Sequence, residues 1–186
     1  DELLAVNPDV CAWLTLDGTN IDYPVLQGES NLSYINTDVY GNFALAGSIF
    51  LDSRNSSTFA DVFSLLYGHH MENSQMFGDL DKYRSVDFLQ QTNTGTLLVP
   101  GGRYALRVFA CIVVSASDDL IYQPLQWQAD NVPAMLDRLQ ADALCVDQAA
   151  MDDLRTAQNP KVLCMSTCSS DYTDARTVVL AAMQLE

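Results

Sequence analysis

Short apolar segments alternate with turn-forming residues along most of the chain, and this pattern predicts a β-rich fold. The clearest hairpin signal is Pro100-Gly101-Gly102, which lies between two such segments, and Asp17-Gly18 separates the first two. The segment 177–183 is apolar at nearly every position, as is typical of a strand buried on both faces. The predicted strands are residues 13–16, 21–25, 48–52, 62–67, 96–99, 104–114, 162–167 and 177–183.

Residues 131–144 break this pattern and predict one amphipathic helix inserted between strands. Pro133 suits a first helical turn, and Asn131 or Asp130 can cap its N-terminus. The apolar positions that repeat at helical spacing are Met135, Leu136, Leu139 and Ala143.

Two shorter helical segments are also predicted, one over residues 30–36 behind a Ser30 cap and one of a turn or two over 75–83. The chain has no internal repeat, low-complexity tract or linker-like run, so we expect a single domain over residues 1–186. Many short strands with one substantial helix predict an all-β fold with added helices. A β-barrel or a β-sandwich fits this arrangement better than a βαβ fold does.

The charge balance argues against two classes of partner. The 186 residues hold 24 acidic and 9 basic side chains, which leaves a formal net charge of −15. Nucleic acids and anionic membrane surfaces bind clustered Lys and Arg, so both are poor partners for this chain. The longest apolar run, residues 108–114, is far shorter than the ~20 residues that cross a bilayer. Because the chain begins at Asp1 without Met, we expect a processed product or a chain trimmed of a targeting segment or anchor.

The five cysteines are an odd number, so at least one stays free or pairs with another molecule. We expect Cys11, Cys111 and Cys145 to be small buried hydrophobic residues. Cys164 and Cys168 are four residues apart on a predicted strand, or about 13 Å, whereas a disulfide needs Cα atoms within about 7 Å. Neither histidine lies near this pair in the sequence, so we expect no metal site and no cofactor.

Cys168 and Arg176 flank the polar loop between the last two predicted strands. If these strands form an antiparallel hairpin, the thiol and the guanidinium share one end of the sheet. A fixed cation there favours the reactive thiolate, and Arg can also donate to a substrate carbonyl. A cysteine nucleophile usually needs an imidazole as proton shuttle, and the chain offers only His69 and His70. Adjacent side chains on an extended backbone point to opposite faces, so only one of them can face the thiol, and we expect the other to be exposed or packed.

The order and spacing of several motifs resemble the sortases, and among them the class B enzymes. Cys168 follows Ser166-Thr167, Arg176 comes eight residues later, and His69 directly follows Tyr67-Gly68. The resemblance selects His69 over His70, because the family's histidine follows the Tyr-Gly pair. The matching segments are residues 7–28 (NPDVCAWLTLDGTNIDYPVLQG), 30–35 (SNLSYI), 47–55 (GSIFLDSRN), 66–77 (LYGHHMENSQMF) and 162–181 (VLCMSTC…ARTVVLA).

The resemblance implies an eight-stranded sortase β-barrel with a helix-containing insertion before the penultimate strand. It also implies a cysteine transpeptidase that cleaves an Asn-Pro-x-Thr-type cell-wall sorting signal after Thr. Cys168 would form a thioacyl intermediate, His69 would transfer protons to and from the amines, and Arg176 would position the signal and donate to its carbonyl oxygen. Such enzymes act on the outer face of the membrane of Gram-positive-type bacteria. Membrane contact would then come only through an anchor absent from this chain.

The same resemblance implies substrate-binding positions whose ordinary structural roles are equally compatible with the sequence. Asn31 could instead cap a helix, Ile35 could pack in the core, Ser166 could be a buried hydroxyl, and Leu120 to Tyr122 could make loop contacts. Asp171 and Asp174 could orient His69, although solvated acids are the better expectation on a polar loop. The predicted substrate-binding residues are Asn31, Ile35, Ser166, Thr167, Leu120 and Tyr122.

The predicted partners are surface proteins or pilins that carry a sorting signal, together with an amine acceptor on a peptidoglycan cross-bridge or a pilin lysine. The residues do not separate wall anchoring from pilin polymerisation. A third alternative, a catalytically silent domain that only binds peptides, is disfavoured by the presence of Cys168, His69 and Arg176. The resemblance implies N-terminal helices before the barrel, and we expect them to be short or absent in this chain, or trimmed from it, because only six residues precede Asn7. The net charge of −15 is unusual beside more basic relatives, and an acidic surface would concentrate a cationic amine acceptor.

Overall fold

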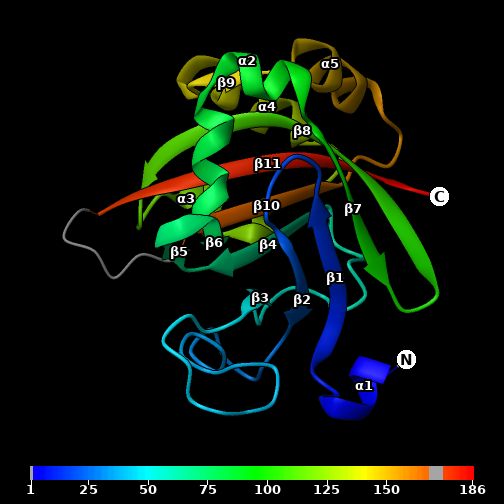
Figure 1. Cartoon of the computed structure of the whole chain (residues 1–186). Coiled ribbons are helices and arrows are strands. Elements are labelled where there is room, and N and C mark those ends of the chain that lie inside the picture. The colour runs from blue at the N-terminus through cyan, green and yellow to red at the C-terminus, as the bar shows by residue number, and fades with distance from the viewer. Residues whose placement is uncertain (1, 168–173) are drawn as a thin grey trace.

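Eight strands form a closed, mixed β-barrel in the computed structural model, which describes residues 2–167 and 174–186 (Figure 1). Around the barrel the order is β1-β2-β3-β4-β10-β11-β8-β7, and β7 pairs with β1 to close it. The β2–β3 and β4–β10 pairs are parallel and the other pairs are antiparallel. The strands are β1 (Val10–Leu16), β2 (Asp22–Leu26), β3 (Ile49–Leu51), β4 (Phe63–Gly68), β7 (Thr94–Val99), β8 (Gly102–Ser115), β10 (Val162–Thr167) and β11 (Ala175–Leu185).

These bounds confirm the eight-stranded barrel that the resemblance implied, and each predicted strand overlaps an observed one. Three short strands lie outside the barrel. Strand β9 (Cys145–Val146) pairs with β8, while β5 (His70–Met71) and β6 (Gln75–Met76) form a separate two-stranded ribbon. Antiparallel pairs can be joined by tight turns, whereas the parallel β4–β10 pair needs a long crossover. Here that crossover contains β7, β8 and the helical insertion.

Helices occur mainly between β6 and β7 and in the insertion between β8 and β10. In Figure 1, α4, α5 and β9 lie together on one side of the barrel, close to α2. The helices are α1 (Glu2–Val6), η1 (Glu72–Ser74), η2 (Gly78–Arg84), α2 (Val86–Gln91), α3 (Asp119–Tyr122), η3 (Pro124–Gln126), α4 (Val132–Asp142) and α5 (Gln148–Thr156).

Two apolar clusters lie on the two faces of β10 and β11. The first fills the barrel and takes Leu163 and Met165 from β10. The second lies between the outer face of the sheet and the insertion, and takes Val162 and Cys164 from the same strand. Alternate side chains of a strand point to opposite faces, so the middle of each strand is apolar at successive positions because both faces are covered. The residues that α4 and α5 contribute to the second cluster are Val132, Met135, Leu136, Leu139, Ala150, Met151 and Leu154.

The predicted helix over 131–144 is confirmed as α4, with a proline in its first turn. Asn131 occupies the N-cap position, but its side chain makes no capping hydrogen bond. It instead accepts a hydrogen bond from the Gln128 amide and donates one to the Gln126 carbonyl. Over 75–83 the structure has β6 followed by the 3-10 helix η2, so the helical prediction holds for the second half of that segment.

The predicted helix over 30–36 is wrong, because this segment forms successive turns. The carbonyls of Tyr34 and Asn36 accept hydrogen bonds from the amides of Ser48 and Ala44 in the same long β2–β3 connection. These carbonyls are therefore not used in a helical ladder. Tertiary hydrogen bonds outweigh the local helical pattern here.

Helix α5 is absent from the sequence-based prediction although its signal is present. Asp147 accepts a hydrogen bond from the Ala150 amide at 3.2 Å, and Ala150, Met151 and Leu154 recur at helical spacing.

The four described cysteines, Cys11, Cys111, Cys145 and Cys164, are free and buried, as expected for the first three.

Replacing Leu136 with Ala tests whether α4 is held by the outer apolar cluster. Leu136 is fully buried, so we expect Leu136→Ala to lower the free energy of unfolding by about 2–5 kcal/mol. Urea denaturation followed by circular dichroism measures this change. The exposed Gln140 on the same helix is the control, and a Gln140→Ala change as large as that of Leu136→Ala would contradict the assignment.

Candidate active site

Three neighbouring strands bring the predicted catalytic segments to one end of the barrel. Strands β4 and β10 run in parallel with Gly68 opposite Thr167, and β11 pairs with the other edge of β10. His69 directly follows Gly68, and Arg176 is the second residue of β11. Cys168 lies outside the described residues, but its chain neighbour Thr167 ends β10 between these two positions. The ends of β4 and β10 and the start of β11 therefore lie at one rim, although Gly68 and Thr167 are far apart in the sequence.

His69 is held by the backbone of the β2–β3 connection. Its Nε2 lies 2.5 Å from the carbonyl oxygen of Ile35, and the side chain is partly buried. A carbonyl only accepts hydrogen bonds, so Nε2 must carry the proton, and in the neutral ring Nδ1 offers the lone pair. Ile35 thus contributes its backbone to the orientation of His69. The neighbouring His70 is exposed and pairs with Asp81, with Nε2 2.7 Å from Oδ2.

Gly68 permits the close packing beneath His69. A Cβ at this position would lie 2.5 Å from the Ile49 Cδ1 and 2.7 Å from the ring of Phe77. The requirement is therefore one of space inside the barrel. It explains why glycine stands next to His69 in the Tyr-Gly-His motif.

Arg176 lies opposite Val114 in the β8–β11 pair and is partly buried. Its Nη1 donates to the Ala175 carbonyl at 3.3 Å. Burial raises the pKa of the nearby Tyr122 to about 12, against the opposing effects of its hydrogen bond with Ser166 and the positive charge of Arg176. Arg176 and Tyr122 therefore interact electrostatically at this rim.

Ser166 and Tyr122 form a hydrogen bond of 2.8 Å between their hydroxyl oxygens. Strand alternation places Ser166 on the outer face of β10 with Cys164. Thr167 is buried, and its hydroxyl donates to the Thr177 carbonyl at 3.4 Å. Leu120 is buried in the outer cluster, and its carbonyl accepts from the Trp127 indole. The hydroxyls of Ser166 and Tyr122 thus face one another at the site, whereas Thr167 and Leu120 are engaged in packing and cross-strand contacts.

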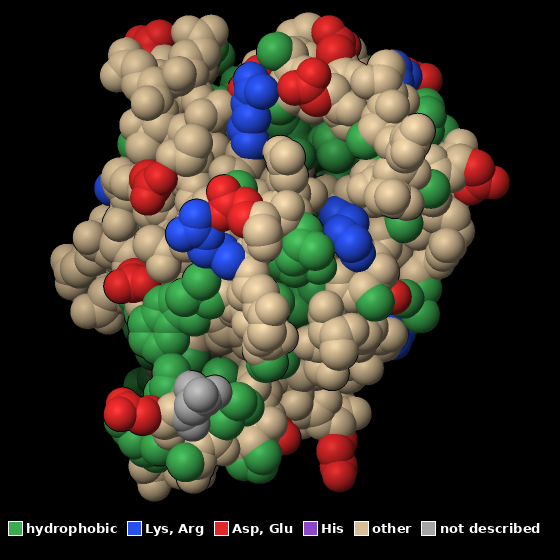
Figure 2. Space-filling view, turned by 90° about the vertical axis from the view of Figure 1, so that its right-hand side faces the viewer, with side chains coloured by type: hydrophobic (Ala, Val, Ile, Leu, Met, Phe, Trp, Pro, Cys, Tyr) green, Lys and Arg blue, Asp and Glu red, His purple; other side chains and the backbone are tan. Residues whose placement is uncertain are grey.

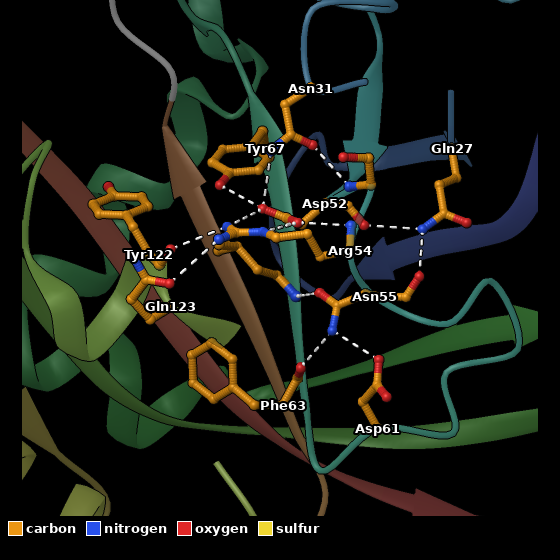
Figure 3. Close-up of polar contacts among 12 residues, drawn as sticks. Gln27, Asn31, Asp52, Arg54, Asn55, Asp61, Phe63, Tyr67, Tyr122 and Gln123 are labelled. Carbon is orange, nitrogen blue, oxygen red and sulfur yellow. Dashed lines mark hydrogen bonds and ion pairs between the residues drawn. The ribbon is translucent and has the colours of Figure 1, made fainter. Parts of the chain in front are cut away.

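A buried acidic residue and its arginine partner, which the sequence analysis missed, lie beside these residues. Figure 3 shows Asp52 at the centre of a polar network. The Asp52 side chain is 0% exposed and pairs with Arg54, whose Nη2 lies 2.8 Å from Oδ2. Asn31 and Tyr67 also donate to this carboxylate, at 3.0 and 2.9 Å. The local signal was an acidic residue directly after the short apolar strand Ile49–Leu51, with an arginine two positions later.

Burial by itself raises the pKa of the Asp52 carboxyl, but hydrogen bonds from Arg54 and Tyr67 outweigh it and hold this pKa below the ordinary value. Asp52 is therefore ionised at neutral pH. For Tyr67, burial and the adjacent Asp52 charge raise the hydroxyl pKa well above its usual range. The phenol stays protonated and remains a hydrogen-bond donor.

Asp171 and Asp174, the two acidic residues that could orient His69, are not part of the network that the structure describes around Asp52. Asp174 is exposed, and its backbone carbonyl accepts from the Ala116 amide. Asp171 lies outside the described residues.

Within residues 2–167 and 174–186, no group of three or more His, Cys, Asp or Glu side chains could hold a metal ion. In the same described part, no helix is long and apolar enough to span a bilayer. Figure 2 shows one face on which acidic and basic side chains are interspersed with hydrophobic groups.

Comparisons with known proteins agree with this fold. Residues 14–184 match the Sortase domain family. The chain is 32% identical to sortase B of Listeria monocytogenes over 182 residues, which are 96% of this chain and 71% of the relative. It is 29% identical to sortase B of Staphylococcus aureus over 183 residues, 97% of this chain and 72% of that protein.

Two solved structures share the architecture closely. Spy0129 of Streptococcus pyogenes, described as a class B sortase involved in pilus biogenesis, superposes with a TM-score of 0.87 at 37% identity, covering 99% of this chain and 97% of its own. A Staphylococcus aureus sortase B–substrate complex gives a TM-score of 0.87 at 28% identity, with 98% and 83% covered. The chain therefore belongs to the sortases, a family of cysteine transpeptidases found at the surface of Gram-positive bacteria. Within that family it is a class B sortase.

Gly68→Ala tests the packing beneath His69. The new methyl group would collide with Ile49 and Phe77, so we expect a loss of about 1–3 kcal/mol in the free energy of unfolding, measured by urea denaturation. Gly102→Ala is the matched control, because its Cβ would meet only ordinary contacts at 3.5 Å or more. Equal stability of the Gly68→Ala and Gly102→Ala proteins would contradict the packing requirement.

Asp52→Asn tests the buried carboxylate through the pH dependence of stability. An amide nitrogen would face the donors that now point at Asp52, so we expect a loss of about 3 kcal/mol at pH 7. The folded-state pKa of Asp52 is lowered, so its contribution is present above the unfolded pKa near 4 and is lost as the pH falls through the folded value. The stability difference between the two proteins should therefore shrink below about pH 4.

Urea denaturation at several pH values measures this difference. Asp142→Asn removes an exposed carboxylate from a helical ion pair and should change stability by no more than about 0.5 kcal/mol. A difference for Asp52→Asn that stays constant from pH 7 to pH 3 would contradict the lowered pKa.

Proposed function

We propose that this class B sortase cleaves an Asn-Pro-x-Thr-type sorting signal after Thr and transfers the acyl fragment to an amine. The observation that carries the proposal is the parallel β4–β10 pairing, with Gly68 opposite Thr167 and β11 on the other side of β10. This arrangement supports a shared rim for His69 and Arg176, at which Cys168, the residue after Thr167, would act. These are the three residue types that a cysteine acyl transfer needs.

In the first half-reaction the Cys168 thiolate attacks the carbonyl carbon of Thr, and a C–S bond forms. The imidazolium of His69 gives its proton to the nitrogen of the departing amine as the C–N bond breaks, which leaves a thioacyl enzyme. In the second half-reaction neutral His69 takes a proton from the incoming amine, which attacks the thioester and releases the thiolate. The bond between Nε2 and the Ile35 carbonyl supports Nδ1 as the nitrogen that exchanges the proton.

Arg176 would stabilise the oxygen on which negative charge develops during both attacks. Its position at the start of β11, beside the end of β10, supports this role. The hydroxyls of Ser166 and Tyr122, which are hydrogen-bonded to each other, would line the peptide path next to it. Asn31, Ile35, Thr167 and Leu120 would support this path through the contacts described above.

The acceptor amine defines two forms of the same reaction. A peptidoglycan cross-bridge amine would make the protein a wall-anchoring enzyme. The similarity to Spy0129, described as involved in pilus biogenesis, supports a pilin lysine as the second candidate acceptor. Both acceptors attack the same thioacyl intermediate, so the assignment of Cys168, His69 and Arg176 is common to them.

Intact-mass spectrometry with an Asn-Pro-x-Thr-Asn peptide tests the nucleophile. We expect a thioacyl adduct on the wild-type protein that is absent from Cys168→Ala and retained in Cys164→Ala, because Cys164 is fully buried and faces the outer apolar cluster. The His69→Ala protein should cleave the peptide far more slowly. Peptide turnover by Cys168→Ala would overturn the assignment.

Arg176→Ala tests the stabilisation of the developing negative charge. Loss of one such donor typically lowers kcat by about 100- to 1,000-fold, and we expect a fall of this size in steady-state cleavage of the same peptide. Arg103→Ala is the control, because Arg103 pairs with Glu186 near the opposite ends of β8 and β11. Equal kcat values for the two variants would contradict the role of Arg176.

A further inference from the structure

The buried Asp52 carboxylate receives hydrogen bonds from three residues on different parts of the site (Figure 3). Its Oδ1 accepts from the Arg54 amide at 3.0 Å and from Arg54 Nε at 2.8 Å. Its Oδ2 accepts from Arg54 Nη2 at 2.8 Å, from Tyr67 at 2.9 Å and from Asn31 at 3.0 Å. Because an ionised carboxylate only accepts, each of these groups is fixed as a donor toward Asp52.

Arg54 connects the same carboxylate to the insertion. Its Nη2 donates to the Tyr122 carbonyl at 3.0 Å, and its Nη1 donates to Gln123 Oε1 at 3.4 Å. These contacts join positions separated by 68 and 69 residues in the chain. The planar guanidinium therefore ties the segment after β3 to α3 and the residue that follows it.

The residues held in this way lie next to the catalytic positions. Tyr67 precedes His69 by two residues on the outer face of β4, and Ser166 lies opposite Tyr67 in the parallel pair. The rings of Tyr67 and Tyr122 are stacked, with centroids 6.4 Å apart and planes 8° from parallel. Tyr122 then contacts Ser166 through the hydroxyl pair at 2.8 Å. One continuous set of contacts thus runs from Asp52 to the strand that precedes Cys168.

We propose that the Asp52–Arg54 ion pair is a positioning unit for the peptide, which sets the place of the Tyr67 and Tyr122 rings and the direction of the Tyr67 hydroxyl. The inference rests on the proposed function, because it assigns the outer face of β4 and β10 to the sorting signal. The Tyr67 proton is committed to Asp52, so the phenolic oxygen offers only lone pairs to a bound peptide. The peptide group that meets it must therefore be an N–H or O–H donor.

Asn31 is positioned by the same unit. Its Nδ2 donates to Asp52, and its Oδ1 accepts from the Ser53 amide at 2.7 Å. Both ends of this amide are therefore bonded within the protein. Asn31 is best assigned as a positioning residue that joins the β2–β3 connection to the ion pair.

Arg54→Lys separates positioning from chemistry. Lysine keeps the positive charge but lacks the planar fork that serves Asp52, Tyr122 and Gln123 together. We expect KM for the Asn-Pro-x-Thr-Asn peptide to rise about 10-fold while kcat stays within about 3-fold, because the Arg54 side chain bonds to Asp52, Tyr122 and Gln123, which carry no step of the proposed chemistry. The rate of Cys168 alkylation by iodoacetamide, measured against pH, should be unchanged.

Arg107→Lys is the matched control. Arg107 is 42% exposed, as Arg54 is 41% exposed, and it also makes a two-point ion pair, with Asp147. It lies on β8 away from the catalytic rim, so we expect Arg107→Lys to leave KM for the peptide unchanged. A general loss of stability would affect both variants, whereas a positioning role affects only Arg54→Lys.

Tyr67→Phe tests the direction of the hydroxyl, because it keeps the ring stack and removes the lone pairs. We expect KM for the peptide to rise as it does in Arg54→Lys. The KM of the double variant Arg54→Lys/Tyr67→Phe should exceed that of the more affected single variant by less than 2-fold, because both substitutions act through the same set of contacts. An unchanged KM in Arg54→Lys would overturn the inference, and so would equal KM values for Arg54→Lys and Arg107→Lys. In either case, peptide cleavage by the wild-type protein would leave the proposed function intact. A wild-type protein that forms no thioacyl adduct would overturn both.

Discussion

The parallel pairing of β4 with β10 is the contact on which the site depends. Parallel neighbours end on the same edge of a sheet, so Gly68 and Thr167, the last residues of these strands, lie at one end of the barrel. The antiparallel strand β11 then begins at the same edge, which brings Arg176 to it. A shift of one residue in this register would turn the outer side chains of β4 or β10 toward the barrel interior. Burial on both faces of β10 fixes the register, because either face would lose apolar contacts if the strand slipped.

Polar interactions organise the outer side of this edge. A fully buried carboxylate is stable only when its oxygens are satisfied, and Asp52 receives donors from Arg54, Tyr67 and Asn31. Because a buried carboxylate without donors would destabilise the fold, each of these three partners must keep its place beside Asp52. The backbone acts in the same way at His69, where the Ile35 carbonyl selects the tautomer of the imidazole. The β2–β3 connection, which contains both Asn31 and Ile35, therefore supports the site in two places.

Membership of the class B sortases connects this arrangement with acyl transfer. The insertion between β8 and β10 has two roles in the fold. Its α4 and α5 cover the outer face of the sheet and complete the second apolar cluster. Its α3 brings Tyr122 to Ser166 and to the ring of Tyr67. The segment that stabilises the barrel is thus also the segment that places the Tyr122 ring next to the proposed catalytic edge.

The sequence by itself determined the eight barrel strands, helix α4 and the residue types of the proposed chemistry. Those features depend on local periodicity and on motifs such as Tyr67-Gly68-His69, which are readable without long-range contacts. It could not determine that residues 31–36 form turns, because the carbonyls there are bonded to Ala44 and Ser48. Nor could the sequence show which residues bond to the Asp52–Arg54 ion pair, because Tyr122 and Gln123 lie 68 and 69 positions from Arg54. Only the closed barrel and its parallel pair decided which distant residues meet, because hydrogen bonds and burial act between groups that chain spacing alone does not bring together.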